Sequence, residues 1–84
     1  MKITIKYFSW IRVKIKMGSE IIETTDNLSF SELKDILRNT NPIFLEVFRD
    51  ESVKYFLNLT EITDPLIYLK DGDEIAFLPP VTGG

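Results

Sequence analysis

The sequence predicts an α+β roll, in which a mixed sheet carries one main helix packed on one of its faces. Residues 2–7 and residues 74–78 both alternate apolar with polar side chains, as half-buried strands do. Between them, residues 29–41 carry apolar side chains at helical spacing. The chain has 84 residues, of which 44% are hydrophobic, and this predicts one domain with one core.

The first quarter of the chain predicts two antiparallel strands. Ile3, Ile5 and Tyr7 alternate with polar residues, which predicts a first strand with one buried face. Residues 9–19 fit either an extension of this strand or a loop with one tight turn, because their apolar and basic residues also alternate. Residues 20–25 then predict a second strand that returns antiparallel to the first.

The helix in the middle of the chain has a clear start and a clear end. Ser29 can cap it, and Glu32 three positions later completes a capping box. Leu28 and Leu33 occupy the two positions of a hydrophobic staple. Asn41-Pro42 ends the helix. The apolar stripe expected to face the core consists of Phe30, Leu33, Ile36 and Leu37.

The second half of the chain predicts two more strands. The pattern of residues 43–52 leaves their conformation open, and residues 53–59 alternate as a strand does. Residues 74–78 follow the turn sequence Asp71-Gly72-Asp73 and stop at Pro79-Pro80. A right-handed crossover allows this last strand to lie parallel to the first. The order strand, strand, helix, strand, strand is that of the β-grasp topology.

Composition excludes several classes of function. The chain has no Cys and no His, which removes the commonest nucleophiles, acid–base groups and metal ligands. A net charge of −3 argues against nucleic acid as a partner. The sequence lacks a membrane-length apolar stretch, a signal-peptide pattern and a recognisable catalytic motif. We therefore expect a cytoplasmic protein without catalytic activity of its own, without a bound metal and without membrane contact.

The last residues, Pro79-Pro80-Val81-Thr82-Gly83-Gly84, carry the strongest functional signal. Two glycines at this position would arise by chance in about 0.5% of chains at average glycine usage. Prolines cannot continue a central strand, so the chain should leave the sheet here. Glycines without side chains could then enter a narrow channel. We expect residues 1–80 to form the domain and residues 81–84 to form a flexible tail.

The stretch from Asp71 to Gly84 closely resembles the end of the small subunit of molybdopterin synthase. The opening strand followed by Phe8 and Arg12, the helix, and Asn58 after a buried strand are also similar to that family. This resemblance covers essentially the whole chain. It implies a ubiquitin-like β-grasp fold and a role as a sulfur carrier.

The resemblance also implies a chemical cycle and a set of partners. A ubiquitin-activating-like adenylyltransferase would use ATP to adenylate the Gly84 carboxylate, and no cofactor would stay bound to the carrier. A sulfur donor would displace AMP and leave a thiocarboxylate. The large subunit of molybdopterin synthase would bind the tail and supply the catalytic residues. Sulfur would then pass to cyclic pyranopterin monophosphate.

Residue by residue, the resemblance gives Gly84 the sulfur and requires Gly83 to keep the tail thin. If the last strand alternates, Ile75 and Phe77 point inward, while Ala76 and Leu78 point outward. Leu78 beside Phe8 would then begin a partner-binding surface. The residues expected to contact a partner are Phe8, Arg12, Leu78, Pro79, Pro80, Val81 and Thr82.

Three other functions fit the same sequence. The chain could carry sulfur for tRNA thiolation or thiamine synthesis, although thiamine carriers tend to be shorter and lack the Phe-Leu-Pro-Pro-Val ending. It could be a ubiquitin-like modifier joined to lysines through Gly84, because carriers and modifiers both need an adenylated diglycine. It could also be a simple interaction module.

Overall fold

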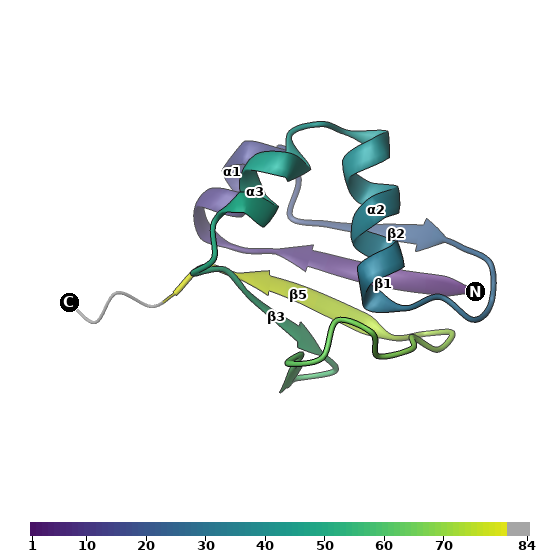
Figure 1. The fold of residues 1–84 in the computed structure, drawn as a ribbon. Coiled ribbons are helices and arrows are strands. Elements are labelled where there is room, and N and C mark those ends of the chain that lie inside the picture. The colour runs from purple at the N-terminus through teal and green to yellow at the C-terminus, as the bar shows by residue number, and fades with distance from the viewer. Residues whose placement is uncertain (81–84) are drawn as a thin grey trace.

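The computed structural model describes residues 1–80, which form one sheet and three helices (Figure 1). All three helices lie on the same face of the sheet (Figure 1). Within the described residues, no helix has the length and apolar composition to cross a bilayer. The elements are β1 (Lys2–Tyr7), α1 (Ser9–Ile15), β2 (Ser19–Glu23), α2 (Phe30–Thr40), α3 (Phe44–Arg49), β3 (Lys54–Leu57), β4 (Thr60–Glu61) and β5 (Glu74–Leu78).

The sheet is mixed, with the strand order β2-β1-β5-β3-β4. β1 pairs antiparallel with β2, and β3 pairs antiparallel with both β4 and β5. The predicted parallel pairing of the first and last strands is confirmed, since Tyr7 of β1 faces Phe77 of β5. β1 and β5 therefore run in the same direction, and their last residues lie at the same end of the sheet (Figure 1).

The core lies between the helices and the inner face of the sheet. Ile75 and Phe77 are fully buried, as strand alternation predicted, and Ile3, Ile5 and Tyr7 cover the same face from β1. Aromatic rings fill the space beneath α3. They pack at centroid distances of 4.9–6.4 Å around Phe77, a range typical of favourable ring pairs.

The predicted helix is confirmed as α2, with both hydrogen bonds of the capping box. The Ser29 hydroxyl oxygen accepts the Glu32 amide at 3.1 Å, and a Glu32 carboxylate oxygen accepts the Ser29 amide at 3.2 Å. Phe30, Leu33 and Leu37 are buried, so most of the apolar stripe faces the core. This helix therefore forms where its sequence pattern places it.

The conformation expected for residues 9–19 is wrong over their first half. Ser9–Ile15 is neither a continued strand nor a loop but the helix α1. Helical winding buries Ile11 and Ile15, four positions apart, and leaves Val13 76% exposed. Contact with β1 and β5 thus overrides the strand preference of the β-branched residues. Lys16, with φ of 70°, then ends the helix in the left-handed region.

The segment left open in the sequence, residues 43–52, contains the short helix α3. Phe44 and Val47, three positions apart, are its buried residues. Asn41 leads into it, since its side-chain oxygen accepts the Ile43 amide at 3.1 Å. α3 completes the layer of helices above the end of β5 (Figure 1).

The predicted strand over residues 53–59 is shorter than its pattern. β3 ends at Leu57, because Asn58 and Leu59 turn the chain with φ of 47° and 73°. Asn58 also donates to the Asp73 carboxylate at 2.9 Å and accepts the Glu74 amide at 2.9 Å. The Asn58 side chain thus links this turn to the start of β5 through two hydrogen bonds.

One buried tyrosine, Tyr7, and one half-buried tyrosine, Tyr55, predict a loss of stability at alkaline pH. Burial, and then the charge of Asp50, raises the pKa of Tyr55 to about 12. Burial, and then a 2.6 Å hydrogen bond to Glu20, also raises the pKa of Tyr7. Because the folded-state pKa exceeds the unfolded value near 10, this stability is complete below about pH 10 and is lost as pH rises through the folded pKa.

Denaturant unfolding between pH 8 and pH 12 checks this expectation. The wild-type protein should lose stability steadily above about pH 10. Tyr55→Phe, which removes the ionisable group and keeps the ring, should lose less over the same interval. Equal declines in the two proteins would show that Tyr55 does not contribute.

Candidate functional site

The end of the central strands brings together two of the residues predicted to contact a partner. Because Tyr7 faces Phe77 in parallel register, Phe8 and Leu78 follow next to each other where β1 and β5 end. Both side chains point away from the helices, since their strand neighbours point into the core. Phe8 is 41% exposed, and Leu78 is half-buried rather than fully exposed. The sequence prediction of a paired Phe8 and Leu78 is consistent with this register.

Phe8 keeps its place at the surface because the chain turns sharply after it. Phe8 has extended backbone angles, whereas Ser9 has φ of 55°. The Phe8 carbonyl oxygen then accepts the amides of Ile11 and Arg12, at 3.2 and 3.4 Å. α1 therefore starts directly from the end of β1, and Phe8 stays outside the core.

Arg12 lies exposed on α1, and its side chain extends over the start of β2. Its Nε atom lies 3.3 Å from the point that a Cβ would occupy on Gly18. The Gly18 carbonyl oxygen accepts the Tyr7 amide at 2.9 Å, which holds this glycine beside the end of β1. Arg12 thus lies on the β2 side of Phe8, whereas Leu78 lies on the β5 side.

Several residues at this end of the sheet were not predicted. Lys54 of β3 faces Leu78 and places a positive charge beside the end of β5. Trp10 and Val13 of α1 are apolar and 36% and 76% exposed. An interpretation of residues 9–15 as a helix would have predicted both as exposed, because they are three positions apart and lie off the face of the buried isoleucines.

The predicted tail falls mostly beyond the described residues. Pro79 is half-buried and Pro80 is exposed, and both follow the last strand as predicted. The predictions for Val81, Thr82, Gly83 and Gly84, including the division at residue 80 and the flexibility of the tail, lie outside the described residues.

Charged groups near α1 are partly paired. Lys14 forms an ion pair with Glu46 of α3, and this contact lowers the pKa of the Glu46 carboxyl. Lys6 and Glu74 lie 3.5 Å apart on the open face of the sheet. Within residues 1–80, no three acidic side chains come close enough to suggest a metal site.

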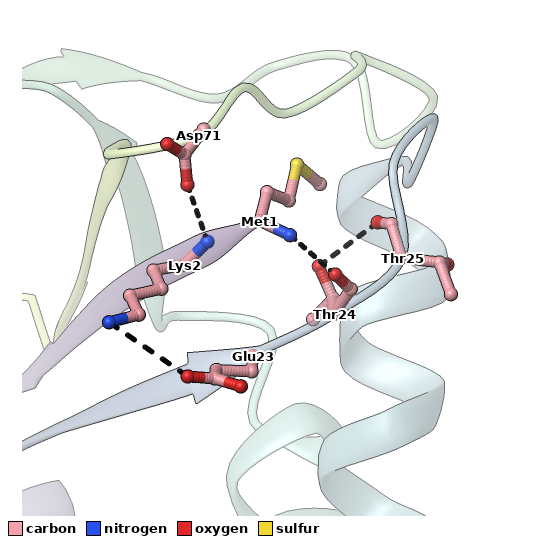
Figure 2. A pocket seen from close by; sticks show the side chains of 6 residues that line it. All are labelled: Met1, Lys2, Glu23, Thr24, Thr25 and Asp71. Carbon is pink, nitrogen blue, oxygen red and sulfur yellow. Dashed lines mark hydrogen bonds and ion pairs between the residues drawn. The ribbon is translucent and has the colours of Figure 1, made fainter.

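A polar hollow lies at the opposite end of β1 (Figure 2). Its polar groups already bond to one another: the Lys2 amide donates to Asp71 at 2.7 Å, and the Met1 amino group donates to the Thr24 carbonyl oxygen at 2.6 Å. The Lys2 ammonium lies 3.9 Å from the Glu23 carboxylate across the same hollow (Figure 2). These contacts are structural, and the hollow is far along β1 from Phe8.

Comparison with solved structures shows three close likenesses in fold. SAMP1 from Haloferax volcanii is 20% identical, with a TM-score of 0.85 and 100% of each chain covered. A putative molybdopterin converting factor subunit 1 from Pyrococcus furiosus is 25% identical, with a TM-score of 0.84, over 96% of this chain and 99% of that one. A chain in the complex of subunits 1 and 2 of the molybdopterin-converting factor from Helicobacter pylori is 30% identical, with a TM-score of 0.71 and 100% of each chain covered.

The fold is therefore the ubiquitin-like β-grasp that the sequence predicted. No curated protein matches the sequence. The model of the ThiS family, in contrast, matches residues 5–84, which is nearly the whole chain. The chain belongs to the ThiS family, within the ubiquitin-like sulfur carriers.

Proposed function

We propose that this chain is the sulfur-carrying small subunit of a molybdopterin synthase and carries its sulfur on the Gly84 carboxylate. The observation that supports this most is the parallel pairing of β1 and β5. It brings Phe8 and Leu78 together at the point where the chain leaves the sheet toward Gly83-Gly84. A partner that binds this apolar end would therefore also be placed to receive the tail.

The proposed chemistry begins with activation of a poor electrophile. A carboxylate oxygen of Gly84 attacks the α-phosphorus of ATP, and pyrophosphate leaves. A sulfur nucleophile at the oxidation level of sulfide then attacks the acyl carbon, and AMP leaves. The product is a thiocarboxylate, whose sulfur attacks a carbon of the pterin substrate and displaces an oxygen there. Water then hydrolyses the acyl–sulfur bond and restores the carboxylate. The described residues include no nucleophilic Cys, so the activating enzyme and the large subunit would supply the catalysis.

Two of the similar structures support the choice of a molybdopterin synthase. One is named a putative molybdopterin converting factor subunit 1, and the other is a complex of subunits 1 and 2 of the molybdopterin-converting factor. The matched chain of that complex is 30% identical over its full length. We therefore propose a large synthase subunit as the partner and cyclic pyranopterin monophosphate as the sulfur acceptor. A cytoplasmic location stays a prediction.

Reconstitution of the cycle tests this function. The chain should be incubated with ATP, a ubiquitin-activating-like enzyme and a sulfur donor, and its intact mass measured. The expected product has one sulfur in place of one oxygen. Adding the large subunit and cyclic pyranopterin monophosphate should return the original mass and form molybdopterin.

Each alternative outcome of this experiment has a clear meaning. No adenylate with an enzyme proven active on its own partner would contradict the carrier function. A thiocarboxylate that forms but never yields molybdopterin would exclude this pathway and leave thiolation of tRNA or thiamine synthesis. Covalent linkage of Gly84 to lysines, without a thiocarboxylate, would identify a protein modifier instead.

A further inference from the structure

The strand β2 lies at one edge of the sheet, and among the described residues it pairs only with β1. The Tyr7 amide donates to Gly18, and Thr24 and Met1 exchange both backbone hydrogen bonds. Hydrogen-bonded pairs alternate along an antiparallel ladder, so Gly18, Glu20 and Ile22 bond to β1. The backbone amides and carbonyls of Ser19, Ile21 and Glu23 therefore point outward along the free edge.

This edge has neither Pro nor Lys, although Glu20 and Glu23 supply two of the charges that discourage pairing. Natural edge strands commonly carry Pro or Lys, or are very short, as β4 is at the other edge. β2 has five residues, and Ile21 at its centre is 67% exposed. A groove lies between β2 and α2, and its lining is mainly apolar: Ile15, Met17, Ile22, Ile36, Leu37 and Phe44.

We propose that the β2 edge binds the β2 edge of a second copy of this chain, antiparallel and centred on Ile21. A two-fold axis through this residue, perpendicular to the sheet, joins the two sheets edge to edge. The helices of both copies then lie on the same face, and the two grooves beside α2 face each other. The pairing satisfies the outward backbone groups and covers apolar surface on both copies.

The residues of β2 suit this register. Ile21 faces its own copy, Ser19 faces Glu23, and Glu20 faces Ile22, so no like charges lie opposite each other. A register centred on Glu20 would instead place two glutamates face to face. A register centred on Ile22 would leave Ser19 without a partner in β2. The sequence of this strand is thus self-complementary around Ile21.

The charges at the two ends of β2 favour the antiparallel direction. Basic Arg12 and Lys16 lie near its start, whereas acidic Glu23 and Asp26 lie at and beyond its end. Glu23 and Asp26 are exposed and only loosely paired, each 3.9 Å from its cation, the Lys2 ammonium and the Met1 amino group. Antiparallel pairing brings the basic end of one copy toward the acidic end of the other, and parallel pairing would bring like ends together. The association should therefore weaken as salt is added.

This assembly does not depend on the proposed function. β5 is separated from the β2 edge by β1, so Phe8 and Leu78 stay free in the paired form. The antiparallel arrangement also places the two β5 ends on opposite sides of the joined sheet. Each copy could then bind its own partner.

Sedimentation equilibrium over a wide range of protein concentration tests the proposal. The wild-type chain should shift from monomer to dimer as concentration rises, and less so at high salt. Ile21→Lys should weaken the association at least about tenfold, because it places two ammonium groups opposite each other. The matched control is Leu66→Lys, since Leu66 is 68% exposed and lies away from β2. Thermal melting of both variants shows that the fold is intact.

A cysteine cross-link tests the register independently. The chain contains no Cys, so Ile21→Cys introduces the only thiol. Facing residues in a hydrogen-bonded pair lie about 5.5 Å apart at Cα, within the range of a disulfide. Mild oxidation should therefore link Ile21→Cys into a dimer much faster than Leu66→Cys. A monomer at every concentration, or equal rates for the two cysteine variants, would overturn the proposal.

Discussion

Deletion of Gly84 should abolish sulfur transfer and leave the melting temperature almost unchanged. The last strand ends at Leu78, and the core residues Ile75 and Phe77 precede that point. The melting temperature should therefore move by no more than about one or two degrees, as expected for a few tenths of a kcal/mol in a domain of this size. Activity should be lost for a different reason. Removing one residue shortens the reach of the tail by roughly 3.5 Å, and about 1 Å of misplacement can cost on the order of a hundredfold in rate.

A bulky side chain near the end of the tail should have the same effect through steric exclusion. Gly83→Phe keeps the length of the chain but should block a channel shaped for bare backbone. The measurement is molybdopterin formation with the large subunit, with thermal melting of the same samples. Thr25→Ala, in the polar hollow at the far end of β1, is the control and should retain activity.

Two outcomes would contradict this expectation. Near-normal product from the truncated protein would show that the Gly84 carboxylate does not carry sulfur. A large fall in melting temperature would show that the tail is part of the folded domain, and the loss of activity would then say nothing about chemistry.

Phe77→Ala should destabilise the domain by roughly 3–5 kcal/mol, the range for a buried aromatic side chain. Phe77 has no exposed surface, and its ring lies 5.3 Å from that of Tyr7 and 4.9 Å from that of Tyr55. Leu78→Ala should cost well below the roughly 2 kcal/mol lower bound for a buried leucine, because Leu78 is half-buried on the open face. It should instead weaken binding to the large subunit, since Leu78 lies beside Phe8.

Denaturant unfolding and calorimetric titration with the large subunit separate these two effects. Ile75→Ala, on the same inner face as Phe77, is the matched control and should lose stability rather than affinity. If Leu78→Ala proved the more destabilising variant, the assignment of inner and outer faces along β5 would be wrong.

The parts of the fold that were predictable are those whose local signals agree with their tertiary environment. α2 has a capping box, an apolar stripe and a stop sequence, and all three indicate the same boundaries. β1 and β5 alternate, and both are half-buried as alternation requires. Their parallel pairing is an arrangement that a right-handed crossover allows.

The helices α1 and α3 were not predictable for the opposite reason. Ile11, Val13 and Ile15 match a strand period, whereas only Ile11 and Ile15 also match a helical one, and Phe8 before them offers no side-chain cap. α3 has six residues and also begins without a side-chain cap. Their conformations depend on the surface that β1 and β5 provide, which short sequence windows do not contain.

Of the candidate site, only the part that depends on the pairing of β1 with β5 could be predicted from the sequence. Phe8 and Leu78 follow from the pairing of β1 with β5. The position of Arg12 over Gly18 depends on α1, and the position of Lys54 opposite Leu78 depends on the order of strands across the sheet. Neither position could be found without the tertiary structure.

The intact mass of this protein isolated from its own cells tests the central claim most directly. We predict a population with one sulfur in place of one oxygen, located at Gly84 by fragmentation. This population should disappear when the adenylating enzyme is removed. A mass that matches the free carboxylate alone in cells actively making molybdopterin, or a Gly84 found only in bonds to lysine, would contradict the account.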